Sequence, residues 1–167
     1  FFDERTSEDV KALTYTSPPL AESLTIVGYP VAHLFVTSTH PDGDVFVYLE
    51  EIDAAGAAHY VTEGALRASY RAVADPPFEN FGLPFRPAVS ESLADLPQGE
   101  PTELVLDLEG TAIVIDAGHR IRVTVAGADR ANYELHPDPR GRDAPTLSIW
   151  RGGEHASYLE LPVAEGP

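Results

Sequence analysis

Alternation of apolar and polar residues with a period of two is the feature of this sequence that most constrains its fold. Residues 120–125 read Arg-Ile-Arg-Val-Thr-Val, and residues 158–163 read Tyr-Leu-Glu-Leu-Pro-Val. Successive side chains of a β-strand point to opposite faces, so this spacing predicts strands with one buried face and one wet face. Residues 45–49 are apolar at every position, which predicts a central strand buried on both faces.

Turn signals separate the predicted strands. Proline presets the backbone for a turn, and glycine accepts the positive φ that many turns need. Such residues recur at Pro41–Gly43, Asp53–Gly56, Asp116–Gly118 and Arg151–Gly153. About nine strands joined by short turns predict an all-β chain, folded as a β-sandwich with Greek-key or jelly-roll connections.

Two segments depart from this pattern. Residues 1–12 are polar, and we expect them to be a linker from an upstream domain, followed by one domain over residues 13–167. The chain contains no Met, so we expect it to be a piece of a longer polypeptide.

A long loop is expected at residues 75–101, which hold six prolines and the aromatic residues Phe78, Phe81 and Phe85. A connection of this length inside a compact domain is often functional or packed on another body. We expect a short helical turn near residues 89–95. The three rings form our candidate docking loop, for a catalytic domain or a second subunit; the alternative is that they close this domain's own core.

Charge and composition exclude several partners. The formal net charge of −16 disfavours nucleic acid and anionic membrane surfaces. No apolar run approaches the roughly 20 residues of a membrane-spanning helix. There is no Cys, so thiolate catalysis and Cys-ligated metal are excluded.

No catalytic or metal motif is recognisable. The Gly-x-Ser-x-Gly turn of α/β-hydrolases is absent, and no histidines have the His-x-His or His-Glu-x-x-His spacing. The acids Asp42, Asp44, Glu50 and Glu51 lack the spacing of a calcium loop. We therefore expect no catalytic residue, no metal and no cofactor. An aromatic platform for sugars, built from Tyr48, Tyr60, Tyr70 and Trp150, remains an alternative to their burial in the core.

The order of several motifs resembles one family. These are Leu13-Thr14-Tyr15-Thr16-Ser17-Pro18-Pro19-Leu20, Asp44–Leu49, Glu63–Arg71, Ala117–Val123 and Arg151–His155. Together they resemble the C-terminal non-catalytic domain of X-Pro dipeptidyl-peptidase-like serine hydrolases, a family that includes cocaine esterase and α-amino-acid ester hydrolases. The resemblance covers about residues 13–163 and implies a jelly roll of the galactose-binding-domain-like type.

The resemblance also implies a role. In such enzymes the Ser, Asp and His of the triad lie in an upstream α/β-hydrolase domain, so no catalytic residue is carried over. We expect an accessory domain that packs on the α/β-hydrolase domain of the same polypeptide and helps shape its active-site entrance. Self-association into a homo-oligomer is left open, and a stand-alone carbohydrate- or ligand-binding module is the alternative.

Overall fold

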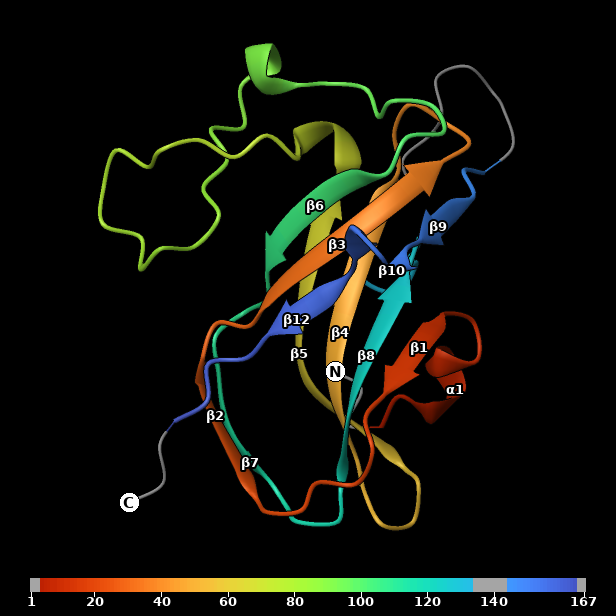
Figure 1. Ribbon diagram of the computed structural model, residues 1–167, viewed down its shortest axis with the longest axis vertical. Coiled ribbons are helices and arrows are strands. Elements are labelled where there is room, and N and C mark those ends of the chain that lie inside the picture. Colours follow the sequence, from red (N-terminus) through yellow and green to blue (C-terminus); the bar gives the residue numbers. More distant parts are fainter. Residues whose placement is uncertain (1–3, 134–143, 165–167) are drawn as a thin grey trace.

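The computed structural model describes residues 4–133 and 144–164, and most of the regular secondary structure in these residues is β-strand (Figure 1). A short helix α1 (Thr6–Asp9) lies near the N-terminus, and the described residues form 3₁₀ turns at Ala68–Tyr70 and Ser90–Ser92. The strands are β1 (Leu13–Thr16), β2 (Leu24–Gly28), β3 (Val31–Ser38), β4 (Asp44–Ile52), β5 (Ala58–Arg67), β6 (Thr102–Asp107), β7 (Thr111–Ile115), β8 (Arg120–Ala126), β9 (Leu147–Ile149), β10 (Arg151–Gly152), β11 (His155–Ala156) and β12 (Tyr158–Glu160).

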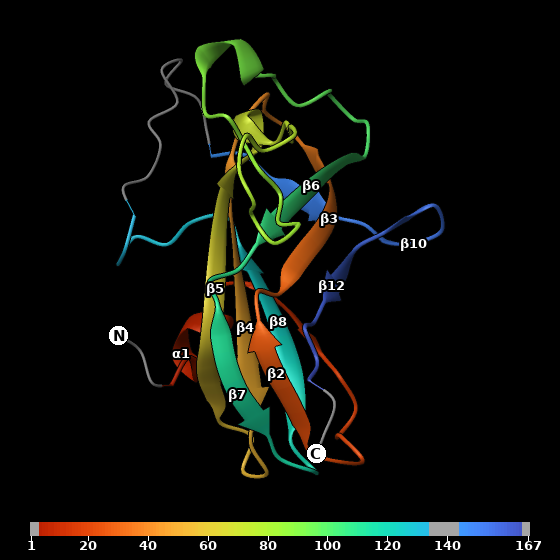
Figure 2. The ribbon, with the colours of Figure 1, turned by 90° about the vertical axis from the view of Figure 1, so that its left-hand side faces the viewer.

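The strands form two layers (Figure 2). The first layer is antiparallel, with the order β1-β8-β4-β5. In the second layer β3 lies between β6 on one side and β12 and β9 on the other. The pair β2-β7 continues the pair β3-β6 beyond a break, where the Leu108 N–H donates a 2.8 Å hydrogen bond to the Pro30 carbonyl. Successive parts of the chain therefore alternate between the layers, as in a β-sandwich.

The core lies between the inner faces of the two layers. Val45, Val47 and Leu49 of β4 are fully buried there, and they belong to one apolar cluster with Leu34 and Leu104 of the second layer. Burial of each such side chain contributes about 1.5–3 kcal/mol. The outer side chains of β4, among them Phe46 and Tyr48, are buried as well, so the prediction of a strand covered on both faces is confirmed.

A close crossing ties the two layers together at β5. The Glu109 N–H donates a 2.8 Å bond to the Glu63 carbonyl, and the Thr62 hydroxyl donates a 2.7 Å bond to the Glu109 carbonyl. A Cβ on Gly64 would lie 2.5 Å from the carbonyl oxygen of Asp107. Only glycine leaves room for the backbone between β6 and β7 to pass here.

The all-β prediction is confirmed, and the helical turn expected near residues 89–95 is the 3₁₀ turn Ser90–Ser92. The finer assignment to a galactose-binding-like jelly roll stays a prediction. Within the described ranges, no helix is both long enough and apolar enough to cross a membrane.

Candidate docking surfaces

The loop between β5 and β6 presents two phenylalanines to solvent. Phe78 is 59% exposed and Phe81 is 81% exposed. Phe85 is half-buried, and its ring meets that of Phe78 edge-on at 5.5 Å. Figure 1 shows the loop (yellow-green) projecting beyond β5 and β6 at the upper left of the sandwich. The alternative that all three rings close this domain's own core is therefore wrong for Phe78 and Phe81.

The tip of the loop holds Phe81 in a costly backbone conformation. Phe81 has a φ of 61° and Gly82 a φ of 75°, two consecutive left-handed residues. The Asn80 side chain fixes this turn, since its Nδ2 donates a 2.6 Å bond to the Leu83 carbonyl and its Oδ1 accepts one from the Gly82 N–H. A bulky non-glycine residue in this region costs about 1–2 kcal/mol, and such strain concentrates at functional positions.

The base of the loop is firmly attached to the sandwich. The Arg71 guanidinium donates to the carbonyls of Ala94 and Asp95. Leu96 is buried, and its N–H donates a 2.6 Å bond to the Pro41 carbonyl. The Ala74 N–H donates to the Phe85 carbonyl at 2.9 Å. The exposed rings therefore lie on a loop whose two ends are held to the sandwich by hydrogen bonds and by the buried Leu96 side chain.

A second surface is the outer face of the first layer, onto which residues 4–12 pack. The Arg5 Nε donates a 2.7 Å bond to Oε1 of Glu50, and the Thr124 hydroxyl donates a 2.8 Å bond to Oε2. The Arg5 guanidinium also lies 3.5 Å above the Tyr48 ring. All four side chains are buried. We call this set, with Asp9 and Arg122, the N-terminal latch.

The buried charged groups of the N-terminal latch make it sensitive to substitution of either of its arginines. The Arg122 guanidinium donates a 2.6 Å bond to Asp9 Oδ2, while Asp9 Oδ1 is buried with no hydrogen-bond partner among the described residues. Burial, together with the nearby Asp9 carboxylate, raises the pKa of Glu50, although bonds from Thr124 and Arg5 act in the opposite direction. Removing either arginine would leave a carboxylate buried without its cation.

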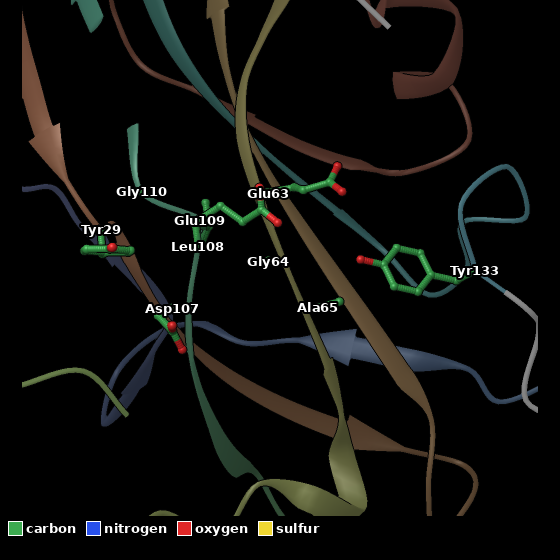
Figure 3. A pocket seen from close by; sticks show the side chains of 9 residues that line it. All are labelled: Tyr29, Glu63, Gly64, Ala65, Asp107, Leu108, Glu109, Gly110 and Tyr133. Carbon is green, nitrogen blue, oxygen red and sulfur yellow. The ribbon is translucent and has the colours of Figure 1, made fainter. Parts of the chain in front are cut away.

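Figure 3 shows an open depression beside β5, with Tyr29 and Tyr133 at its two ends and Glu63 and Glu109 between them. Burial raises the pKa of Glu63, and the charge of Asp129 adds to this effect. The lining offers two phenols and three carboxylates, and no nucleophile paired with a base. It therefore has no recognisable means of acyl transfer.

The histidines pair with carboxylates outside this depression. His119 Nδ1 lies 2.7 Å from Glu51, His33 Nδ1 lies 2.9 Å from Glu103, and His59 Nε2 lies 2.9 Å from Asp53. Within residues 4–133 and 144–164, none of these histidines is also hydrogen-bonded to a serine hydroxyl. The same residues contain no cluster of metal-ligating side chains.

Two alternatives from the sequence do not assemble. Asp44 pairs with Arg67, Glu50 with Arg5 and Glu51 with His119, so these acids do not converge on a calcium ion. The expected aromatic platform for sugars does not form, because Tyr48 is buried in the first layer and Trp150 follows β9 in the second layer. The pairing of β9 with β3 separates them. The four residues of that platform were Tyr48, Tyr60, Tyr70 and Trp150.

The chain is similar to a known domain family and to parts of larger proteins. The family described as the X-Pro dipeptidyl-peptidase C-terminal non-catalytic domain matches residues 2–160. A putative serine esterase of Mycobacterium tuberculosis (strain CDC 1551 / Oshkosh) is 41% identical over 166 residues, which are 98% of this chain and 26% of that protein. The cocaine esterase of Rhodococcus sp. (strain MB1 Bresler) is 27% identical over 160 residues, 90% of this chain and 25% of that protein.

Solved structures agree in fold. An α-amino acid ester hydrolase superposes with a TM-score of 0.77 at 24% identity, over 96% of this chain and 27% of that one. A CocE/NonD family hydrolase from Staphylococcus aureus gives a TM-score of 0.76 at 20% identity, over 93% and 31%. The chain thus spans about a quarter of the length of the curated relatives it matches. It belongs to the family of X-Pro dipeptidyl-peptidase C-terminal non-catalytic domains.

Proposed function

We propose that this chain is the accessory domain of a serine hydrolase, packed on an α/β-hydrolase domain of the same polypeptide through the loop that carries Phe78 and Phe81. The loop helps to shape the entrance of the active site, and the catalytic triad lies in the α/β-hydrolase domain. The observation that carries this proposal is Phe81, an 81% exposed ring held on a left-handed backbone.

Energetics support a docking role for the loop. Burying a phenylalanine side chain contributes about 1.5–3 kcal/mol. The isolated domain forgoes most of this contribution at Phe81 and part of it at Phe78. The domain also bears the backbone strain at Phe81, where glycine or asparagine would be cheaper. Exposed aromatic rings and backbone strain therefore occur together at one loop tip. A partner that covers the rings would recover the free energy of their burial.

The chemistry of the partner surface follows from the loop. The tip presents aromatic rings, and the chain as a whole has a formal net charge of −16. We expect the rings to enter an apolar recess in the hydrolase domain, since burying charged groups without partners would be costly. The relatives' names point to ester bonds, and the family's name points to X-Pro peptide bonds, as the class of bond cleaved.

The test uses the full-length protein with Phe78 and Phe81 both changed to alanine. We expect kcat/KM for a p-nitrophenyl ester to fall about 10- to 100-fold, because small displacements near an active site have effects of this size. The melting temperature should fall as well. Val114→Ala is the matched control, since Val114 is 54% exposed on β7, at the opposite end of the sandwich from the loop (Figure 1).

Kinetics and melting temperature equal to those of the wild type in the double variant would contradict docking through this loop. Loss of activity in the control variant to the same degree would show that any exposed apolar side chain has the effect, and would also remove the support for the loop.

A further inference from the structure

Five aromatic rings lie on the outer face of the second layer, in one stacked pair and one group of three. The rings of His33 and Tyr158 are parallel within 6° at 4.4 Å. The ring of His155 lies 5.3 Å from that of Phe35 and 6.0 Å from that of Trp150. We call these five residues the aromatic row.

Strand register explains why the rings gather there. Ala32, Leu34 and Val36 of β3 point into the core, so His33 and Phe35 point outward. Tyr158 is the direct cross-strand neighbour of His33. The Trp150 N–H donates a 2.9 Å bond to the Phe35 carbonyl, and the Ser157 N–H donates a 3.1 Å bond to the Trp150 carbonyl. These bonds hold Trp150 beside Phe35, and the pairing of β12 with β3 holds Tyr158 beside His33.

The row is accessible and has polar groups along it. Trp150 is 42% exposed and Tyr158 is 49% exposed. The carboxylate of Glu103 lies 2.9 Å from His33 Nδ1, and that of Glu160 lies 3.8 Å from His33 Nε2. In each of these acids, the second carboxylate oxygen has no hydrogen-bond partner among the described residues. A ligand lying over the His33–Tyr158 pair would find carboxylate acceptors near both ring nitrogens of His33.

We propose that the aromatic row is a binding site for the rings of a neutral polysaccharide. A sugar ring has an apolar C–H face that stacks on an aromatic ring, and hydroxyls at its edge that donate to carboxylates. The stacked pair His33–Tyr158 is already ordered, so binding costs little conformational freedom. Anionic ligands are disfavoured, because Glu103 and Glu160 flank the row and the Arg151 guanidinium lies over the Tyr15 ring instead.

The position of the row keeps it apart from the N-terminal latch. Figure 2 shows α1 on the outer side of the first layer, while β12 and β10 lie on the opposite side of the sandwich. A polypeptide that enters along residues 4–12 therefore reaches the domain on the face away from the row. The proposal does not depend on the docking loop, and its test leaves ester hydrolysis as a separate readout.

The test is native affinity electrophoresis of the full-length protein in gels that contain hydroxyethyl cellulose, laminarin, galactomannan or amylopectin. We expect at least one of these polysaccharides to retard the protein. Trp150→Ala and Tyr158→Ala should each raise the dissociation constant about tenfold, the size expected for loss of an aromatic stacking contact. Trp150→Tyr should retain most of the binding, and Phe81→Ala, which changes an exposed ring outside the row, should leave it unchanged.

Thermal unfolding by circular dichroism, recorded for each variant, separates loss of the site from loss of the fold. Absence of retardation by all four polysaccharides would overturn the proposal, and so would equal retardation of Trp150→Ala. A fall in esterase activity in the row variants, without sugar binding, would show that the row contacts another domain and would overturn it too.

Discussion

Replacing Arg5 by alanine should destabilise the domain far more than its place in a polar N-terminal segment suggests. The Arg5 Nε–Glu50 Oε1 distance is 2.7 Å, and the side-chain exposures are 8% and 0%. Removing one partner of a buried ion pair costs about 3–5 kcal/mol, because the remaining charge is left uncompensated. For a domain of this size we expect the melting temperature to fall by roughly 6–20 °C.

The destabilisation caused by Arg5→Ala should depend on pH, and the direction follows from the pKa of Glu50. Burial raises the pKa of Glu50 above its unfolded value, so the folded state keeps its proton to higher pH. The stability associated with that proton is complete below the unfolded pKa and is lost as pH rises through the folded pKa. Without Arg5 the carboxylate loses its cation, so Arg5→Ala should be more harmful at pH 8 than at pH 5.

The assay is urea unfolding followed by circular dichroism at both pH values, with Lys11→Ala as the matched control. The Lys11–Glu8 pair also lies in the N-terminal segment, but its side chains are 68% and 39% exposed. Exposed pairs contribute about 0–1 kcal/mol. Adding Glu50→Gln to Arg5→Ala should restore part of the stability at pH 8. The reasoning is refuted if Arg5→Ala costs no more than Lys11→Ala, or if its cost is the same at both pH values.

Two further predictions concern the backbone. Gly64→Ala places a Cβ 2.5 Å from the Asp107 carbonyl oxygen, and we expect about 1–3 kcal/mol of destabilisation in urea unfolding. The control is Gly152→Ala, because a Cβ on Gly152 meets nothing within 4 Å and neither glycine has a positive φ; the control should cost less, and equal costs would contradict the close crossing. Phe81→Gly should relieve about 1 kcal/mol of strain and leave the domain as stable or more stable, while lowering kcat/KM of the full-length protein; a rise in both quantities would argue against a docking role for Phe81.

The strands were predictable from local sequence, because the order of apolar and polar residues within each strand depends on which of its faces is buried. The alternation in residues 120–125 and the apolar run 45–49 depend only on neighbours in sequence, and both became strands of the first layer. The short helical turn at Ser90–Ser92 was predictable for the same reason.

Contacts between distant segments were not predictable in this way. Arg5 and Asp9 lie in a segment whose polarity indicates exposure, yet both are buried against Glu50 and Arg122. One signal was present, since Glu50 follows an unbroken apolar run and a charge there needs a partner. The aromatic row had no such signal, because it depends on the pairing of β9 and β12 with β3, which the sequence does not specify locally.

The central claim is that this chain supplies surfaces to a hydrolase and no catalytic centre. The most direct test is p-nitrophenyl acetate hydrolysis by the 167-residue chain and by the full-length protein, each with and without a serine-directed phosphonate. We predict turnover that the phosphonate abolishes in the full-length protein, and only the background rate from the 167-residue chain, whose fold is verified by circular dichroism. Phosphonate-sensitive turnover by the folded chain alone would contradict the claim, because it would require a nucleophilic serine within this domain.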